Sequence, residues 1–594
     1  MKRHALIPWL IFSLVALVYA FPILEKISYW GYSDWDQFTF WNAVPRETIL
    51  RYHQFPLWNP YANGGNVMLA HPDSPFLSPF YVFVLLFGPV LGLKLEIIIH
   101  LIAGLGGMFL LSQYMGMGSR SSYFAAFVYM LSSVYALHLT EGQMEWLALA
   151  FVPWVFLYYL KGIKETRWVL GAIFFLGSIL IGGVYVFNLF IVFLSIYAVL
   201  KALQLKQLAP IKTLIFILAG TFLLCSIKLF PMLEFFSQYP RITHEMSGVD
   251  LASLSQMLLS RQQALLDMRL WDTTIKNGEL VHGWHEYGAY IGIIPLLLFL
   301  WGAVKRFFTD WPFLLAGLIA LFIAFGRKFP INLWGVLKSL PVYGSLTVPS
   351  RFMFCFIFCV AILSGFGLSC FEQRNLAIHK YWNPAAAKSL TVIVVLVVLF
   401  DLWQVNSPIF RHAFGIPPMR VTKSAFFAQR YRGINYYEKK VSRSSQYPIF
   451  LSNSGILGAY EVVYIKRGKV RIISDPDYRG EVYLDKSYGK VTMKYFSPNK
   501  IIVDVDAKQD DILVVNQNYY RGWRVKKEKK TLHAASYKGL IAASVSRGRQ
   551  RIIFYYMPFS FLAGFCVTLS FLSVVAVFYR KQLGMSKFSE KLSK

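Results

Sequence analysis

Asp34 and Asp36 stand two positions apart just after the first apolar run, in a stretch crowded with Trp, Tyr and Phe. A carboxylate at the end of a helix, facing a half-apolar cavity, can accept a proton or hold a divalent cation. Both states suit the deprotonation of an alcohol. The alternative is a solvated pair that caps a helix, because Asp is common just before a helical stretch. The nearby Arg46, the Gly64-Gly65 turn and the aromatic residues favour a catalytic role.

Arg351 is the first candidate for binding an anion, because it stands at one end of the apolar run 350–369 and follows Pro349. The N-terminus of a helix also favours negatively charged groups. The alternative is an arginine that only anchors its helix by reaching towards the membrane surface. Further cations that could share this role are Arg327, Lys328, Arg241 and Lys228.

Four other polar residues are predicted to lie near the substrate. His285 and Glu286 stand at the mouth of an apolar run, where we expect them to line a groove. With His282 they do not form a zinc signature, and the sequence leaves open whether a divalent cation takes part. Glu141, in a short hairpin, and Asp73, in the same loop as the first acidic pair, are supporting carboxylates or ordinary polar residues.

The composition is that of an integral membrane protein. Of 594 residues, 56% are hydrophobic and only 15% are charged, against roughly 25% charged residues in a typical soluble domain. Apolar runs of about 18 residues or more, each long enough to cross a bilayer, recur along the chain. A soluble globular enzyme and a disordered chain are both excluded. The five cysteines lie in or beside apolar runs and predict no disulfide framework.

The positive charge is concentrated in one region. The net charge is +29, and residues 411–551 hold 28 Lys+Arg against 11 Asp+Glu, a net +17. In a membrane protein such charge reflects basic cytoplasmic loops and an external region that meets anions. We therefore expect the bilayer, and no nucleic acid, as a partner.

We predict that residues 76–91 do not cross the membrane, because the basic loops then fall consistently on the cytoplasmic side. Pro79 and Pro89 suit a broken or interfacial helix there. We predict twelve spans with both termini in the cytoplasm; the first, 6–24, is predicted to be retained, with a cleaved signal peptide as the alternative. Gly182-Gly183 is the predicted turn between two of the spans. The others are 95–114, 120–138, 145–161, 168–185, 186–203, 212–230, 286–304, 311–326, 350–369, 388–406 and 556–579.

Residues 407–555 form a predicted external module with β structure. The runs Lys500–Asp506 and Lys469–Asp475 alternate apolar and polar residues at period two, and turn residues separate such runs. The predicted domains are thus a transmembrane catalytic domain over 1–406, a β-sandwich-like extracytoplasmic domain over 407–555, and a last span with a cytoplasmic tail over 556–594.

The sequence contains no GxxxxGK[ST] motif and no GxGxxG set between a strand and a helix, so no nucleotide site is indicated. The candidate carboxylates lie outside, where nucleotide sugars are scarce. A sugar linked to a lipid phosphate would reach them from the outer leaflet. Its transfer leaves a lipid phosphate, which needs cations close to the membrane surface.

Several motifs occur together in an order that resembles the YfhO family of bacterial membrane proteins. The first loop carries Ser33-Asp34-Trp35-Asp36 and a later group that includes Gly64-Gly65. The resemblance covers nearly the whole chain, and its order and spacing are more specific than any single piece. The further matching pieces are Phe55-Pro56-Leu57-Trp58-Asn59-Pro60, Leu77-Ser78-Pro79, Trp284 to Gly292, Leu340-Pro341, Val348 to Phe352, Tyr519 to Trp523 and Phe554 to Pro558.

The resemblance implies a GT-C fold, the multi-span fold of glycosyltransferases that use polyprenyl-phosphate-linked sugars. It also implies that an acidic residue of the first external loop is needed for catalysis. That role is carried over only to Asp34 and Asp36, and the sequence does not choose between them. The identity of the acceptor does not transfer.

We therefore expect an inverting glycosyltransferase of the cytoplasmic membrane, with an extracytoplasmic active site. It would move a sugar from a polyprenyl-phosphate donor to a cell-envelope glycan or lipid-linked polymer. A transporter or flippase of a lipid-linked substrate is the rival, but Glu96, Lys228 and Asp401 lie towards the ends of spans rather than at mid-span. A non-catalytic envelope scaffold is the third alternative.

Overall fold

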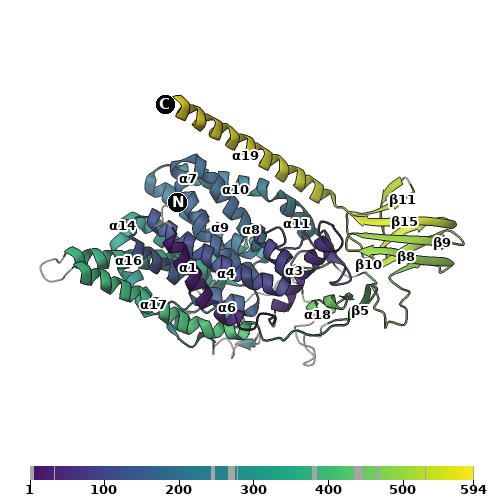
Figure 1. Ribbon diagram of the computed structural model, residues 1–594, viewed down its shortest axis with the longest axis horizontal. Coiled ribbons are helices and arrows are strands. Elements are labelled where there is room, and N and C mark those ends of the chain that lie inside the picture. Colours follow the sequence, from purple (N-terminus) through teal and green to yellow (C-terminus); the bar gives the residue numbers. More distant parts are fainter. Residues whose placement is uncertain are drawn as a thin grey trace. The chain divides into compact units, whose positions relative to one another are not determined.

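Two compact units make up the described part of the chain (Figure 1). Unit 1 is formed by Met1–Thr39, Leu77–Leu218 and Ile242–Pro418, and unit 2 by Phe40–Phe76, Ala219–Arg241 and Met419–Lys594. The computed structural model describes residues 6–31, 34–241, 248–264, 274–276, 279–281, 283–328, 330–377, 384–433, 446–459, 461, 463–465, 468–528 and 530–592.

Long apolar helices dominate these residues. Eight of them are long and apolar enough to cross a membrane within the described chain, and a bent pair would make a ninth. With the β sheets near the C-terminal end, they confirm a multi-pass helical membrane protein that carries a β-sheet domain. The eight spans are Pro79–Tyr114, Ser119–Glu141, Met144–Lys164, Val184–Leu205, Ile293–Ala324, Pro349–Gln373, Lys388–Arg411 and Phe559–Phe578.

The predicted number of twelve spans is not confirmed. The helices α1 (Ile7–Tyr19) and Thr166–Gly182 are apolar but shorter than 18 residues. Two neighbouring predicted spans are joined in one helical run, α14 (Ile293–Ala324), which has non-helical backbone only at Asp310. Basic residues there indicated a loop, whereas the backbone makes a kink.

The segment 76–91, on which the predicted topology depends, runs into the next helix without a separating loop. It contains the 3-10 turn η2 (Pro79–Tyr81) and the start of α4 (Val82–Tyr114). α4 is broken at Gly88, where φ is 82°, a value that glycine adopts at little cost. The break lies beside Pro89, which lacks the N–H that a continuous helix needs. The expectation of a broken helix is thus confirmed.

The predicted span 212–230 is not one continuous helix. α10 (Ala209–Leu224) and α11 (Ser226–Gln238) meet at Cys225 with a bend of 83°. Apolar residues continue through the bend, so hydropathy alone does not reveal it. Such a break leaves backbone groups without helical partners, which is costly in a membrane.

The last span of the chain supplies those partners. In α19 (Phe559–Leu592), the Thr568 hydroxyl accepts a hydrogen bond from the N–H of Ile227 at 3.0 Å and donates one to the carbonyl of Leu224 at 3.1 Å. Gly564 allows the close approach, because a Cβ there would lie 2.2 Å from a backbone oxygen of α11. α19 therefore packs directly against the bend between α10 and α11 in unit 2.

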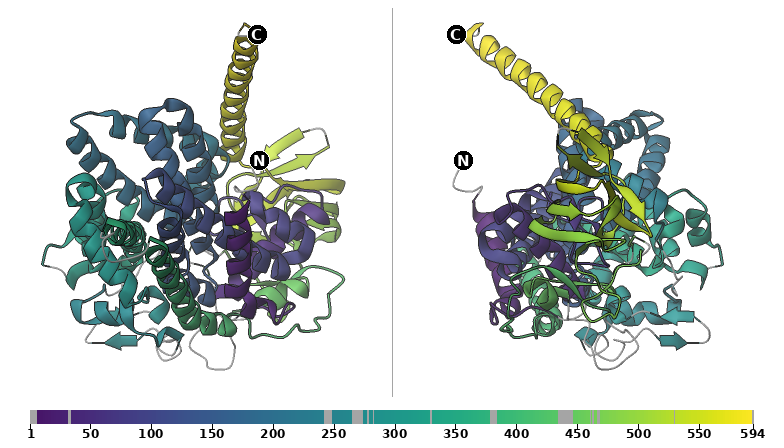
Figure 2. Two further views of the ribbon diagram at one scale, coloured as in Figure 1. Left: turned by 60° about the vertical axis from the view of Figure 1, so that its left-hand side comes forward. Right: turned by 90° about the vertical axis from the view of Figure 1, so that its right-hand side faces the viewer.

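The two larger sheets of unit 2 are antiparallel, with four and five strands, and Figure 2 shows the unit's strands from two further sides. The strand orders are β13-β14-β10-β7 and β12-β11-β15-β9-β8. A cluster of buried apolar side chains lies within the unit and includes Val470, Val514 and Leu540. The strands are β7 (Val482–Leu484), β8 (Gly489–Ser497), β9 (Lys500–Ala507), β10 (Asp511–Asn518), β11 (Trp523–Lys527), β12 (Lys530–His533), β13 (Ala535–Tyr537), β14 (Leu540–Val545) and β15 (Gly548–Tyr556).

The two predicted alternating runs have different outcomes. Lys500–Asp506 is confirmed as a strand, because in β9 every second residue from Ile501 to Ala507 is buried. Lys469–Asp475 is not a strand, although Val470 and Ile472 are buried as the alternation indicates. Part of the backbone of this segment forms hydrogen bonds with side chains instead of with a neighbouring strand. For example, the N–H of Arg471 donates to the amide oxygen of Asn516 at 2.9 Å.

Candidate active site

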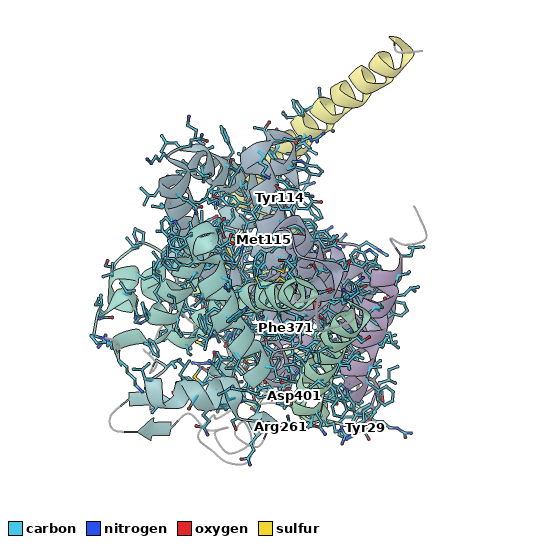
Figure 3. All side chains as sticks on the ribbon, turned by 90° about the vertical axis from the view of Figure 1, so that its left-hand side faces the viewer. Tyr29, Tyr114, Met115, Arg261, Phe371 and Asp401 are labelled. Atoms are coloured by element: carbon cyan, nitrogen blue, oxygen red, sulfur yellow. The ribbon has the colours of Figure 1, made fainter. Side chains whose placement is uncertain are left out.

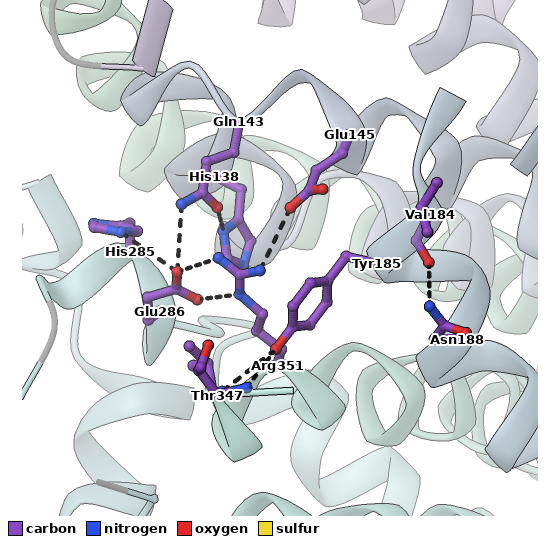
Figure 4. Close-up of polar contacts among 11 residues, drawn as sticks. His138, Gln143, Glu145, Val184, Tyr185, Asn188, His285, Glu286, Thr347 and Arg351 are labelled. Atoms are coloured by element: carbon purple, nitrogen blue, oxygen red, sulfur yellow. Dashed lines mark hydrogen bonds and ion pairs between the residues drawn. The ribbon is translucent and has the colours of Figure 1, made fainter. Parts of the chain in front are cut away.

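A buried ion pair between Arg351 and Glu286 forms the centre of the candidate site in unit 1 (Figure 4). Arg351 lies in η8 (Pro349–Phe352), directly before α16 (Met353–Ala377), and Glu286 ends η5 (Trp284–Glu286). The Nε and Nη2 atoms of the arginine donate to the two carboxylate oxygens at 2.8 and 2.6 Å. Two parallel bonds of this kind fix both side chains strongly.

Glu145 and Tyr185 complete the surroundings of the guanidinium. A carboxylate oxygen of Glu145 accepts a hydrogen bond from Nη1 of Arg351 at 3.4 Å, and the Tyr185 ring centroid lies 4.2 Å from the guanidinium carbon. The Tyr185 hydroxyl in turn accepts from the backbone N–H groups of Thr347 and Val348. Arg351 is thus bound by two carboxylates and an aromatic ring in this state.

The hairpin after α6 (Ser133–Glu141) joins the same cluster. Nε2 of Gln143 donates to Glu286 at 3.3 Å, and its amide oxygen lies 2.7 Å from Nδ1 of His138. The His138 ring stacks on Trp146, with the ring centroids 3.6 Å apart. The chain of contacts from Trp146 to Glu286 gives the carboxylate a fixed position.

His285 and Glu141 lie at the edge of this cluster. A ring nitrogen of His285 is 3.7 Å from Glu286 and the other is 4.0 Å from Glu141. Both side chains are largely buried. Four residues that the sequence assigned to the substrate, Arg351, Glu286, His285 and Glu141, are therefore brought together from three separate segments.

The carboxyl of Glu286 remains ionised inside the protein. Burial would raise the pKa of Glu286, but the charge and hydrogen bonds of Arg351 hold that pKa well below its usual range. The site therefore combines one bound cation with several carboxylates.

The predicted catalytic pair begins α3 (Asp34–Leu50), whose first residues belong to unit 1. Asp34 is half-buried, whereas Asp36 is completely buried. Trp35 between them donates its indole N–H to the carbonyl of Leu139 at 2.8 Å. Gly142, where φ is 93°, lies so close that a Cβ there would be 2.1 Å from the backbone nitrogen of Trp35. The acidic helix thus begins directly against the hairpin that carries Glu141, Gln143 and Glu145.

A buried lysine that the sequence analysis did not select holds the preceding segment. The Nζ of Lys94, in α4, donates to the carbonyls of Lys26 and Ile27 at 2.6 and 3.1 Å. Next along the chain, Trp30 and Ile416 exchange two backbone hydrogen bonds. These contacts fix the path that leads into the acidic helix.

Arg327 and Lys328 lie beside the segment that carries Arg351. They end η6 (Gly326–Lys328), and a Cβ on Gly326 would lie 3.0 Å from the ring of Pro349. Both cations are exposed, and Lys328 is 3.5 Å from Asp250.

Residues on both sides of Glu286 in the sequence contact α17 (Pro384–Ala413). Arg261 forms an ion pair with Asp401, and the Tyr290 hydroxyl donates to the other oxygen of that carboxylate at 2.6 Å. Figure 3 labels Arg261 and Asp401 at this contact. Asp401, considered from the sequence as a span-end charge, is therefore bound by Arg261 and Tyr290.

Asp73 and Arg241, also predicted site residues, belong to unit 2. Asp73 lies 4.0 Å from the ring of His71. Lys228, a cation in the same prediction, donates to the carbonyls of Pro72 and Ser74 and is fully buried. These three residues therefore belong to a different unit from Arg351 and Glu286. His282 lies outside the described residues.

No group of three His, Cys, Asp or Glu residues is arranged to hold a metal ion in the part of the chain that the structure describes. The carboxylates of unit 1 contact cations and polar groups instead, as Glu286 contacts Arg351 and Gln143. Sequence patterns gave no signal for His138, Gln143 and Tyr185, because neither their spacing nor their type stands out. Only the tertiary contacts identify them.

The comparison with protein families supports the resemblance found in the sequence. The model described as "Bacterial membrane protein YfhO" matches residues 484–568, which extend from the end of β7 to Thr568 in α19. The resemblance to that family is thus confirmed over this stretch. No curated protein has a sequence that matches this chain.

Three solved structures align with this chain at low sequence identity. The archaeal oligosaccharyltransferase AglB from Archaeoglobus fulgidus, in complex with an inhibitory peptide and a dolichol-phosphate, gives a TM-score of 0.43 at 11% identity; the match covers 77% of this chain and 64% of that one. The arabinofuranosyltransferase AftD from Mycobacteria gives 0.41 at 12%, covering 77% and 32%. ArnT from Cupriavidus metallidurans, bound to undecaprenyl phosphate, gives 0.37 at 14%, covering 68% and 75%. The chain thus spans less than two thirds of the first two proteins.

Proposed function

We propose that the protein is an inverting membrane glycosyltransferase that uses a polyprenyl-phosphate-linked sugar. The observation that supports this most is the position of Asp34, against Gly142 and next to the hairpin that contacts the Glu286–Arg351 pair. The acceptor would be an extracytoplasmic glycan or lipid-linked polymer, and both chain termini would be cytoplasmic.

Asp34 is the proposed base. It is half-buried and so can meet a substrate, whereas Asp36 has no exposed surface. In the proposed step the acceptor oxygen forms a bond to the anomeric carbon, and its proton passes to the Asp34 carboxylate. The bond from the anomeric carbon to the phosphate oxygen breaks, and polyprenyl phosphate leaves. Asp36 would support the start of the helix.

Arg327 and Lys328 are the proposed receptors of the leaving phosphate. They are exposed and lie on the turn that packs against Pro349. Arg351 was the first candidate from the sequence, but its guanidinium is bound by Glu286 and Glu145. We therefore assign Arg351 to holding Glu286 in place.

The test compares Asp34→Asn with Asp36→Asn in purified protein reconstituted in a bilayer. Loss of a general base typically lowers the rate about 10²- to 10⁴-fold. We expect this loss of kcat in Asp34→Asn, with the donor KM and the melting temperature nearly unchanged. Asp36→Asn should instead lower the melting temperature. Full sugar transfer by both variants would remove the proposed mechanism. Absence of sugar transfer in the wild-type protein would instead favour a transporter or a scaffold.

A further inference from the structure

We propose that unit 2 binds the headgroups of anionic phospholipids where α19 leaves the five-stranded sheet. Three cations gather at this end: Arg521, Arg524 and Lys500. We call them the basic collar. The proposal is independent of the proposed transferase activity.

Strand register places two of the cations in one row. Arg524 of β11 lies opposite Tyr555 of β15, and Tyr555 lies opposite Lys500 of β9. Directly opposite residues of antiparallel strands point to the same face of the sheet. Arg524, Tyr555 and Lys500 therefore form one continuous row across three strands.

The turn that carries Arg521 is locked to the start of the last span. The N–H of Met557 donates to the carbonyl of Gly522 at 2.9 Å. Gly522 has a φ of 102°, and a Cβ there would lie 2.8 Å from Pro558. The collar is thus held at the level of the residues that immediately precede Phe559.

That level corresponds to a membrane surface. The span Phe559–Phe578 has a mean hydropathy of 2.4, and only 11% of it is buried within the protein. Phe559 itself is 76% exposed, in the position of an interfacial aromatic anchor. Tyr555 is four residues away, at most about 14 Å along an extended chain, so its row reaches the headgroup layer.

The collar cations lack acidic partners. Arg521, Arg524 and Lys500 form no ion pair with any residue that the structure describes, and Nε of Arg524 is buried without a hydrogen-bond partner among those residues. Basic residues held near a membrane surface attract anionic lipids by about fivefold each.

Acidic residues on the same face lie farther from the span. Asp504 pairs with Arg551, and Asp506 pairs with Arg549. A long anionic polymer lying along the sheet would pass these two carboxylates, whereas a lipid headgroup at the α19 end would not. The distribution of charge therefore favours a lipid surface.

The experiment uses the full chain in nanodiscs of phosphatidylcholine and phosphatidylglycerol, with spin-labelled lipids as probes. The collar variant combines Arg521→Gln, Arg524→Gln and Lys500→Gln. The control removes the same charge from exposed positions at the far end of the module, with Lys490→Gln, Lys508→Gln and Arg547→Gln. We expect the preference for phosphatidylglycerol to fall at least fivefold in the collar variant and to stay within twofold of wild type in the control.

An unchanged lipid preference in the collar variant would overturn the proposal. So would an equal loss in both variants at unchanged melting temperatures. In the first case, binding of a soluble polyanion such as dextran sulfate is also measured in phosphatidylcholine nanodiscs, and loss of this binding in the collar variant would assign the collar to a polymer.

Discussion

Arg351, at the centre of the candidate site, has contacts that its residue type and sequence position did not predict. Its type and its place before a membrane span indicated an anion receptor. The structure shows that two carboxylates already bind Arg351. No single-sequence pattern predicts such a pair, because Glu145, Glu286 and Arg351 are far apart in the chain and only the tertiary fold brings them together.

The two assignments of the cations can be separated by mutation. Breaking a buried ion pair leaves an uncompensated charge and typically costs about 3–5 kcal/mol. We therefore expect Arg351→Met to lower the stability strongly. Arg327→Gln with Lys328→Gln should keep the melting temperature and raise the donor KM about tenfold or more.

The measurements are thermal unfolding and steady-state kinetics on the same reconstituted samples, with Lys338→Gln as a matched control for charge. If Arg351→Lys folds normally and loses only donor binding, the phosphate is bound by Arg351, and the assignment to Arg327 and Lys328 is wrong.

A buried acid in unit 2 gives a prediction about pH. Burial raises the pKa of Glu461 to about 8, although the amides of Asn66 and Asn63 donate to it at 2.6 and 3.0 Å. Between its ordinary pKa near 4.5 and about 8, the folded protein holds a proton that the unfolded chain releases. The contribution of Glu461 to the free energy of unfolding is therefore fully present below about pH 4.5 and is lost as the pH rises through about 8.

We therefore expect the melting temperature of wild type to fall relative to that of Glu461→Gln between pH 5 and 8.5. The glutamine keeps the shape and cannot ionise, so it isolates the contribution of this one group from that of the buried His71. Parallel pH profiles for the two proteins would contradict a raised pKa.

At the scale of elements, apolar runs and turn signals locate most helices and the central strand β9. The turn at Gly182-Gly183 is confirmed, because α8 (Val169–Gly182) and α9 (Val184–Leu205) meet at Gly183. Sequence reasoning missed the bend at Cys225, since the partners that permit it come from α19, more than 300 positions later. A local window contains no signal for such a contact.

The partner contact at the bend can be tested directly. Thr568→Val removes the hydroxyl that bonds to the N–H of Ile227 and the carbonyl of Leu224. Leaving such buried groups unpaired typically costs about 1–3 kcal/mol. We expect a loss of stability in this range, measured by denaturant unfolding in mild detergent.

Thr568→Ser keeps the hydroxyl and should restore most of that stability. Equal stability of the valine variant and wild type would mean that the hydroxyl does not support the bend.

At the scale of the whole molecule, composition establishes a membrane protein, and the alternation in residues 407–555 predicts a β module. The family model of a bacterial membrane protein, which matches residues 484–568, and the apolar helices agree with the first of these. The number of spans does not follow from composition, because kinked and short apolar helices resemble complete spans in hydropathy. The division of the first loop between the two units does not follow from composition either. Residues 25–39 belong to unit 1 and residues 40–76 to unit 2. The motifs of the first loop are therefore divided between the two units.

The most direct test of the account is a cryo-EM structure of the reconstituted protein with a non-transferable polyprenyl-phosphate sugar analogue. We expect the sugar against Asp34 and the phosphate within hydrogen-bond distance of Arg327 or Lys328, with the Arg351–Glu286 pair intact. Donor density on a part of the protein remote from Asp34, with that carboxylate facing only protein atoms, would contradict the account.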